Sequence, residues 1–460
     1  MKELRKLGLQ ILPDDEGLKV NNLMNYAFFL TPVQKELLQT EEMGRLYTLR
    51  QLSFCYVLDF KSINMGHISA THSRLEHSII TADYVRYFFK EKNAWKYTPP
   101  QEFVELVALL HDTGHTACSH AFERDTKRSQ EKQIENIIFG KTRNNGGLTV
   151  AEVLEKYDVD KRKVFEDITE KNENPETLLV SQFCDRLAYI IDDAHHSHEK
   201  VQLMNWKDGP IKAGQHILGS NLKMDEKELY VDLRNLTLSD GDLLEFEGLD
   251  DLEWLDCMAN LCISRTQLFM NVYGSPSNSK CVTLARNAAQ LGYEEKWLSD
   301  DDLFYLNDEL LIKKFLQHDS TRDFAEQIKL RKLPDTALAV SLNEEDYKRL
   351  SPLKEKRDLR LEFEEKVGGL FDINPLAKFS IPKIGYVAKN KNGRLDEFSR
   401  LCSDIQSYKS MHDAWVTRRL VVYANKGQNP KKVAEKAVKE LGLNTFEDDY
   451  ISLRPFELND

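Results

Sequence analysis

The sequence has little of the material from which disulfide frameworks, zinc knuckles or membrane spans are built. Its 460 residues include seven scattered cysteines and no C-x-x-C pair, so neither a disulfide framework nor a structural zinc site is predicted. No run of about 18 apolar residues occurs, and the N-terminal segment MKELRKLGLQ lacks a long apolar stretch. We therefore expect a cytoplasmic protein that does not associate with a membrane.

An excess of positive charge is also lacking. The formal net charge is −12, so a general electrostatic attraction to nucleic acid is not indicated, although a local basic pocket is compatible with this total. Apolar residues make up 41% and charged residues 30%, which is typical of a globular protein with a sizeable core. The length suits one large domain with an appendage, or two to three domains.

Histidine, in contrast, is concentrated in one third of the chain. Nine of the 12 histidines lie between residues 67 and 198. Within this region His77, the dipeptide His111-Asp112 and Asp185 provide two imidazoles and two carboxylates, a set of ligands that suits a divalent transition metal. A lone histidine is more often structural, but this ordered set beside apolar segments favours a metal-dependent catalytic core.

Apolar periodicity predicts that most of the first 330 residues are helical. The clearest predicted helices are Gln34–Gln51, Glu76–Lys90, Phe103–His111, Leu178–Asp193 and Trp254–Tyr273. Beyond residue 330 the sequence predicts a charged helix, Lys356–Lys366, and two β-rich segments, Lys378–Lys389 and Thr417–Tyr423. The predicted fold class is therefore mainly α, with a helical core over residues 1–330 and a small α+β part over 331–460. The metal site is expected within 42–200 and the rest of the substrate pocket within about 254–280.

Spacing places further polar side chains near the candidate metal ligands. His115 follows His111 by four residues and shares its helical face, and His120 comes five residues later, close enough to reach the same cleft. On the helix Leu178–Asp193, residues 185, 189 and 193 lie along one face. A solvated face is the alternative interpretation, but the narrowness of this polar stripe favours a cavity wall. Arg186 lies beside it as a candidate phosphate contact.

The motifs occur in an order that resembles a known family. They are Thr71-His-Ser-Arg-Leu-Glu-His-Ser78, His111-Asp-Thr-Gly-His115, Ser119-His120 and Asp185-Arg-Leu-Ala-Tyr189, with weaker similarity at Glu42–Leu52, Asn374-Pro-Leu and Arg418–Tyr423. The set resembles the HD superfamily of metal-dependent phosphohydrolases, and within it the deoxynucleoside triphosphate triphosphohydrolases, which include bacterial dGTPase-like enzymes and the mammalian SAM-and-HD-domain dNTPase. The resemblance implies an HD-type helical core that cleaves a dNTP, with dGTP a candidate substrate, to deoxynucleoside and triphosphate. Metal-activated water would attack the α-phosphorus.

The same resemblance implies a role for each matching residue. His77, His111, Asp112 and Asp185 would bind the metal, which could be Mn, Fe, Mg, Co, Ni or Zn. His115 or His120 would act with Asp112 in catalysis as the proton donor to the leaving group. The substrate-binding residues would be Arg74, Arg186 and Arg265 at the phosphates, Tyr189 as a hydroxyl donor, Gln51 and Asp193 at the 3′-hydroxyl, and Tyr273 against the sugar. Homo-oligomers (dimer, tetramer or hexamer) and allosteric activation by a nucleotide are further family properties, for which residues 331–460 are a candidate region.

Three departures from the family pattern leave alternatives open. Gln130 stands where the family often has a histidine, Phe269 replaces another, and Gly274-Ser275-Pro276 replaces a Gln-His-Lys string. The chain could therefore act on nucleoside monophosphates, cyclic nucleotides or oligonucleotides, or be a nucleotide-sensing or nucleic-acid-binding protein with a weak site. The dense group His195, His196 and His198 suggests a second metal, but we favour a solvated helix end for it.

Overall fold

A computed structural model describes the chain in a series of ranges. These are residues 9–11, 18–20, 27–28, 30–55, 57, 72–91, 101–122, 129–142, 146–171, 174–198, 200–205, 210–218, 222–224, 229–232, 236–238, 244–246, 249–374, 385–387 and 419–443. Among them no helix is both long and apolar enough to cross a bilayer. The six cysteines in these ranges are buried and form no disulfide.

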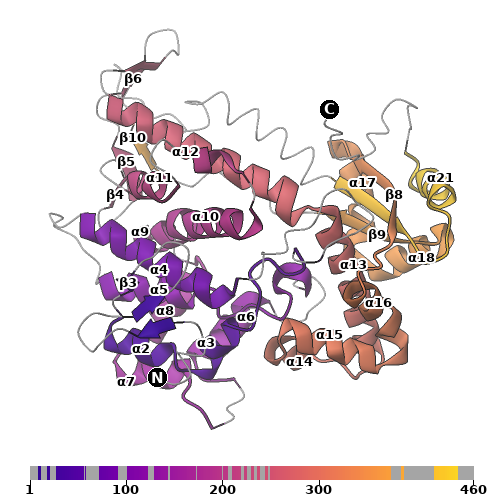
Figure 1. The fold of residues 1–460 in the computed structure, drawn as a ribbon, viewed down its shortest axis with the longest axis horizontal. Helices are drawn as coiled ribbons and strands as arrows, with labels where there is room; N and C mark the ends of the chain where they lie inside the picture. The colour runs from indigo at the N-terminus through magenta and orange to yellow at the C-terminus, as the bar shows by residue number, and fades with distance from the viewer. Residues whose placement is uncertain are drawn as a thin grey trace.

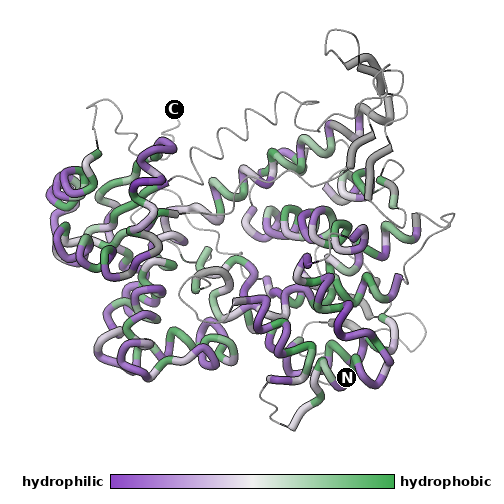
Figure 2. Tube along the Cα trace, turned by 180° about the vertical axis from the view of Figure 1, so that it is seen from behind, coloured by the Kyte–Doolittle hydropathy of each residue, from purple (hydrophilic) through white to green (hydrophobic). Residues whose placement is uncertain are grey.

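The molecule is mainly helical, as predicted, with its helical core drawn on the left of Figure 1 and a small sheet on the right. Helix α4 (Arg74–Glu91) packs against α5 (Gln101–Leu110) and α10 (Asp185–Ser197). Helix α5 is apolar on nearly every face, and its residues 104–110 are all buried, so it forms the centre of the core. In Figure 2 green and purple segments alternate along most other helices, which is the pattern of amphipathic helices around such a centre.

Two helices connect the helical core to the sheet. Helix α12 (Leu249–Leu268) runs from the core towards the sheet, and α13 (Pro276–Glu294) lies beside strand β9 (Figure 1). The other α-helices are α2 (Pro32–Leu37), α3 (Glu41–Leu46), α6 (Gln130–Ile138), α7 (Val150–Lys156), α8 (Lys161–Ile168), α9 (Pro175–Leu178), α11 (Pro210–Ile217), α14 (Asp300–Tyr305), α15 (Asp308–Gln317), α16 (Asp319–Lys329), α17 (Glu344–Glu355), α18 (Arg357–Val367) and α21 (Pro430–Leu441).

The single helix predicted over Gln34–Gln51 is wrong, because the chain forms the two short helices α2 and α3 there. The side chain of Thr31 caps α2 by accepting a hydrogen bond from the Gln34 amide, and Thr40 caps α3 by accepting from the Met43 amide. A capping threonine takes an extended backbone conformation, so Thr40 interrupts the helix even though the apolar spacing continues through it.

Two other predicted helices contain a π-helical turn. Segment η2 (Leu179–Cys184) is π-helical and lies between α9 and α10, and η4 (Phe269–Tyr273) continues α12 in the same way. A π turn inserts one residue and so changes the direction of the side chains that follow it. Such turns are frequent at functional sites, and periodicity alone does not predict them. The chain also forms the 3₁₀ turns η1 (Ser119–Phe122) and η3 (Gln202–Asn205).

The C-terminal sheet has three antiparallel strands with β11 in the centre. Strand β11 (Arg419–Ala424) pairs with β8 (Asp335–Ser341) and β9 (Gly369–Asn374), so that Arg419 lies opposite Ser341 and Asn374. The predicted strand Thr417–Tyr423 and helix Lys356–Lys366 are thus confirmed to within two residues of each boundary. A Cβ at residue 369 would lie 2.6 Å from the Tyr423 carbonyl oxygen, so only glycine fits where β9 begins.

The remaining strands are short. They are β1 (Leu9–Ile11), β2 (Leu18–Val20) and β3 (Ala27–Phe28), then β4 (Leu222–Met224) and β5 (Leu229–Asp232), then β6 (Leu236–Leu238), β7 (Leu244–Phe246) and β10 (Gly385–Val387). Strand β10 pairs in parallel with β5. It is the described portion of the predicted β segment Lys378–Lys389, and the rest of that segment lies outside the described residues.

The sheet and helices α17, α18 and α21 enclose a second core. Its largest members are Phe363 and Phe371, whose rings meet edge to face at 5.1 Å. Polar contacts join this part to the helical core, since Arg286 on α13 pairs with Asp372 on β9 at 3.3 Å and Arg419 donates to the Gly274 carbonyl at 3.0 Å. These contacts place strand β9 against the helical core.

A buried carboxyl at this junction generates a prediction on stability. Burial, only partly offset by the Phe371 amide, Arg360 and Arg286, raises the pKa of Glu364 to about 7. The unfolded chain has a pKa of about 4.3 for this group, so its contribution to stability is complete below that pH and is lost as pH rises through 7. Between pH 4 and 8 the wild type should lose on the order of 3 kcal/mol relative to Glu364→Gln. Urea unfolding across this pH range measures it, and parallel pH profiles would contradict the assignment.

Candidate metal centre and active site

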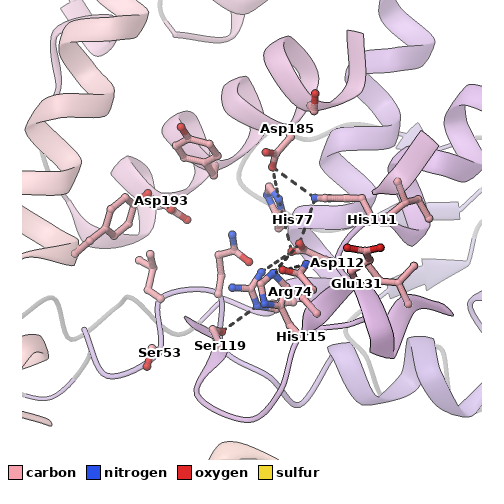
Figure 3. A pocket seen from close by; sticks show the side chains of 18 of the residues that line it. Ser53, Arg74, His77, His111, Asp112, His115, Ser119, Glu131, Asp185 and Asp193 are labelled. Carbon is pink, nitrogen blue, oxygen red and sulfur yellow. Dashed lines mark hydrogen bonds and ion pairs between the residues drawn. The ribbon is translucent and has the colours of Figure 1, made fainter. Parts of the chain in front are cut away.

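The four residues proposed from the sequence as metal ligands meet at one point, although they come from three separate segments (Figure 3). His77 lies in the first turn of α4, His111-Asp112 lies in the turn that follows α5, and Asp185 is the first residue of α10. Asp185 Oδ1 is 3.0 Å from His77 Nε2 and 3.5 Å from His111 Nε2. The carboxylate of Asp112 is 3.4 Å from His111 Nε2 and 3.8 Å from His77 Nε2.

These separations fit a metal ion. Ligand atoms about 2.1 Å from one ion lie roughly 3.0–3.4 Å from one another in octahedral or tetrahedral geometry. His111 Nδ1 donates to the Ala108 carbonyl at 2.6 Å, which leaves Nε2 directed at the cluster and fixes the tautomer that a metal requires. The chemistry of the donors, two imidazole nitrogens and two carboxylates, therefore fits a divalent metal.

The electrostatics of the cluster agree with this geometry. Burial opposes ionisation of Asp112, but Arg74, His111 and His115 hold the pKa of its carboxyl well below the usual range. Burial likewise lowers the pKa of His111, but Asp112 and Asp185 outweigh it and raise that pKa to about 9. The two carboxylates thus concentrate negative potential where the imidazoles point, and a cation at this point would be stabilised.

Arg74 holds Asp112 in place. Its guanidinium donates from Nη1 to Asp112 Oδ2 at 2.6 Å and from Nε to Ser119 Oγ at 2.9 Å, and its side chain is 2% exposed. Ser119 Oγ in turn donates to the Arg50 carbonyl at 3.0 Å. Arg74 thus positions a candidate metal ligand, and it also lines a cavity beside the cluster.

The turn that carries His111 and Asp112 is held by residues that sequence reasoning missed. Asp308 accepts from the Cys118 amide at 2.6 Å and from the Arg50 amide at 3.1 Å, and Arg45 donates to the Thr113 carbonyl at 2.7 Å. A Cβ on Gly114 would lie 2.6 Å from the Gln130 carbonyl oxygen, so the turn needs glycine to pack on α6. Asp308 lies 190 residues from its partner Cys118, and no local sequence signal could have joined them.

A cavity of about 820 Å³ opens beside the cluster. The candidate ligands lie in its wall. So do six of the seven substrate-binding residues expected from the sequence, namely Gln51, Arg74, Tyr189, Asp193, Arg265 and Tyr273. The cavity also extends past the predicted range 254–280, because Arg286 on α13 and Asp372 on β9 line it. Among the described atoms Gln51 Oε1 is buried and has no hydrogen-bond partner, so it is free to accept one from a ligand.

The wall away from the metal cluster is a connected polar set. Tyr273 OH donates a hydrogen bond to Asp193 Oδ2, and Arg265 Nε donates to Tyr189 OH at 2.6 Å. Burial raises the pKa of Tyr189 despite its neighbouring arginines, so it remains a phenol and its proton is available to a ligand. Phe269 lies under Arg265, with the guanidinium carbon 4.6 Å from the ring centroid. The residue that departs from the family pattern thus supports Arg265 by a cation–π contact.

The other expected residues take different positions. His115 Nε2 is 3.1 Å from Asp112 Oδ1 and 3.2 Å from the side-chain nitrogen of Gln130, so His115 borders the metal cluster. The backbone of His120 belongs to η1, but its side chain lies outside the described residues. Arg186 is buried, donates to Gln182 Oε1 at 2.7 Å, and is not among the cavity-lining residues of the described chain. Its role at a phosphate therefore stays a prediction without geometric support.

Comparison with known proteins agrees with this geometry. Residues 74–201 match the family model described as HD domain. The chain contains an HD domain. This range includes all four candidate ligands, and HD domains bind divalent metal ions.

Similar proteins are found in bacteria and archaea. The uncharacterized protein MJ1154 of Methanocaldococcus jannaschii is 24% identical over 434 residues, which cover 92% of this chain and 82% of that protein. The uncharacterized protein YwfO of Bacillus subtilis is 32% identical over 176 residues, or 35% of this chain and 36% of that protein. The chain thus spans most of the first relative and about a third of the second.

Two solved structures share the fold. A hypothetical protein from Aquifex aeolicus superposes with a TM-score of 0.60 at 21% identity, covering 90% of this chain and 96% of that one. The phosphohydrolase BT4208 from Bacteroides thetaiotaomicron superposes with a TM-score of 0.58 at 14% identity, covering 89% and 99% respectively. The similarity in both cases extends through the C-terminal α+β part as well as the HD domain.

Asp308 provides a test of how the metal-binding turn is held. Asp308→Ala leaves the Cys118 and Arg50 amides without their acceptor, so we expect a loss of about 1–3 kcal/mol in the free energy of unfolding. Glu309→Ala is the matched control, because Glu309 is 68% exposed and its ion pair with Arg50 contributes little. Urea unfolding of the three proteins measures the difference. Equal losses in the two variants would show that Asp308 does not hold the turn.

Proposed function

We propose that the protein is a metal-dependent phosphohydrolase that cleaves a deoxynucleoside triphosphate at the α-phosphorus, releasing the deoxynucleoside and triphosphate. The observation that carries this proposal is that one cavity contains both the His/Asp cluster and a polar wall suited to a nucleotide sugar. The HD domain match and the fold shared with a phosphohydrolase support the reaction class.

The proposed reaction breaks the bond between the α-phosphorus and the 5′ oxygen. His77, His111, Asp112 and Asp185 would hold a divalent metal, which would supply Lewis acidity for activating water. Water oxygen forms the new bond to phosphorus, so triphosphate leaves with that oxygen and the 5′ oxygen leaves with the nucleoside. The residues of the chain must then neutralise the phosphate oxygens and deliver a proton to the 5′ oxygen.

Arg265 and Tyr189 are suited to the phosphate oxygens. Arg265 Nη1 is buried and forms no hydrogen bond with the described residues, while Nε is held by Tyr189 and the guanidinium plane by Phe269. An arginine fixed in this way loses little entropy when it binds an oxyanion, and it stabilises charge that increases in the transition state. Tyr189 can donate its own proton to the same phosphate.

His115 is the candidate acid for the 5′ oxygen among the described side chains. It is 3% exposed, it borders the metal cluster, and it contacts both Asp112 and Gln130. A protonated imidazole at this position could give its proton to the departing 5′ oxygen. Gln130 occupies the place of a further family histidine and cannot transfer a proton, so His115, together with His120, would carry this step.

At the sugar end, Gln51, Asp193 and Tyr273 are suited to a deoxyribose. Gln51 Oε1 is available as an acceptor, and Asp193 Oδ2 already accepts from Tyr273. A 3′-hydroxyl can donate to either oxygen. The Tyr273 ring meets Phe269 edge to face at 4.8 Å, which fixes the tyrosine as a flat wall beside the sugar.

One observation favours a second candidate, a phosphohydrolase that acts on a nucleotide with a single phosphate. Arg74 already donates to Asp112 and Ser119, and Arg186, which is not among the cavity-lining residues of the described chain, donates to Gln182. Of the three arginines expected at the phosphates, Arg265 has a buried Nη1 without a hydrogen-bond partner among the described residues. A triphosphate would then depend mainly on Arg265 and on side chains outside those ranges.

Product analysis distinguishes the two candidates. Purified protein is incubated with each of the four dNTPs and with GTP, in Mn²⁺ and in Mg²⁺, and the products are separated by ion-exchange chromatography. We expect deoxynucleoside and inorganic triphosphate, with little cleavage of GTP because Tyr273 lies beside the sugar. Nucleoside monophosphate or orthophosphate would contradict cleavage at the α-phosphorus. Turnover of monophosphates alone would establish the second candidate, and binding without turnover would exclude both.

The role of Asp112 is tested by an isosteric change. Asp112→Asn removes the charge of one candidate ligand and should lower kcat/KM by at least roughly 10³-fold, or about 4 kcal/mol of transition-state stabilisation. Asp319→Asn is the matched control, because Asp319 is 90% exposed and does not line the cavity, and it should leave kcat/KM unchanged. Activity of Asp112→Asn within tenfold of the wild type would remove the cluster from the mechanism.

A further inference from the structure

A second group of metal-type ligands lies on the same two helices, away from the cluster described above. His72 lies two residues before α4, Glu76 lies in the first turn of α4, and Asp192 and His196 lie one turn apart on α10. The rings of His72 and His196 are stacked, with centroids 4.2 Å apart and an interplanar angle of 11°. Asp192 lies against Nε2 of both imidazoles.

We propose that His72, Asp192 and His196, completed by Glu76, form a second binding site for a divalent transition metal. Asp192 is separated from Asp185 by seven residues of α10, which is about 10 Å along the helix. Because seven residues make nearly two full turns, both carboxylates face α4. The two sites share no ligand.

The separations between the ligand atoms carry the proposal. Asp192 Oδ2 is 3.6 Å from His72 Nε2, Asp192 Oδ1 is 3.5 Å from His196 Nε2, and Glu76 Oε1 is 3.8 Å from His196 Nε2. Hydrogen bonds between such groups measure about 2.7–3.2 Å, so these contacts are too long to be hydrogen bonds. They are close to the separation of roughly 3.3 Å between ligands that share one tetrahedral ion.

The surroundings of Asp192 provide a second, independent observation. Its side chain is 3% exposed, and Oδ2 has no hydrogen-bond partner among the described residues. Burial, together with the carboxylates of Glu76 and Asp193, raises the pKa of Asp192 well above its usual range. A buried carboxyl oxygen without a hydrogen bond is costly, and a cation between Asp192 and the two imidazoles would remove that cost.

The charged and titratable groups that face Asp192 are the carboxylates of Glu76 and Asp193 and the imidazoles of His72 and His196. His72 is buried, and burial lowers its pKa although Asp193 opposes the shift, so its imidazole is neutral and suited to a metal. Two imidazoles with two carboxylates select a transition metal such as Zn²⁺, Co²⁺ or Mn²⁺ over Ca²⁺.

The proposed site also adjoins the cavity. His72 Nε2 contacts Asp193 Oδ1 at 2.8 Å, while Asp193 Oδ2 accepts from Tyr273 in the cavity wall. A metal that takes His72 Nε2 releases this contact with Asp193. Occupancy of the second site would then alter Asp193, the acceptor proposed to face the sugar. This consequence rests on the proposed function, but the metal site itself does not.

Metal stoichiometry tests the site without any assay of activity. The full-length protein is freed of metal with a chelator, dialysed against Co²⁺ or Zn²⁺, and analysed by plasma mass spectrometry. We expect two equivalents in the wild type and one in Asp192→Asn and in His196→Gln. His195→Gln is the matched control, because His195 is the exposed neighbour on the same helix, and it should keep two. Asp112→Asn should still bind the equivalent of metal that Asp192→Asn and His196→Gln lose.

The outcomes separate this proposal from the proposed function. One equivalent in the wild type that persists in the Asp192 and His196 variants and disappears in Asp112→Asn overturns the second site. The wild type could instead bind one equivalent that Asp112→Asn keeps and His196→Gln loses. That result would support the second site and contradict the first. Circular dichroism of the metal-free variants checks the fold. If a variant unfolds, Co²⁺ titration of the wild type tests for the second site instead. A single absorption change that saturates at one equivalent of Co²⁺ would overturn the proposal.

Discussion

The arrangement of this protein depends on how charged groups are paired inside a nearly dry helical core. Arg74 and Asp112 form an ion pair that is almost completely buried, and breaking such a pair by removing one partner costs several kcal/mol. This pair ties the start of α4 to the turn after α5 and so brings His77 to His111. Asp185 then enters from α10 at the end of a π-helical turn. The position of the candidate metal ligands relative to one another therefore depends on this buried ion pair.

The sequence predicted those parts of the molecule that depend on local pattern. The mainly helical core, the small C-terminal sheet and the meeting of His77, His111, Asp112 and Asp185 all follow from periodicity and from motifs in a fixed order. The division of Gln34–Gln51 into two helices was missed because a capping threonine leaves the apolar spacing intact. The π turns were missed because they carry no residue signature. Asp308 and Asp372 were missed because they act on residues far away in the chain. The group of His72, Asp192 and His196 was missed for the same reason, since dense histidines at a helix end indicate a solvated cap until His72 is placed against them.

The departures from the family pattern have physical explanations in the structure. Phe269, which stands where the resembling family often has a histidine, supplies an aromatic face for Arg265. Gln130 contacts His115 and so stays within the site without proton chemistry. The segment after Tyr273 turns directly into α13, and Arg419 from the C-terminal sheet holds the Gly274 carbonyl. The small sheet thus contributes to the cavity wall through Asp372 and to the shape of the pocket end through Arg419.

The central claim is that four side chains from three segments hold one divalent metal at the mouth of a nucleotide-sized cavity. Anomalous diffraction from crystals soaked in Mn²⁺ or Co²⁺ tests it most directly. The account predicts a peak about 2.0–2.3 Å from His77 Nε2, His111 Nε2 and a carboxylate oxygen of both Asp112 and Asp185. A fully soaked crystal with no peak among these four residues, while the cluster keeps the separations described here, would contradict it.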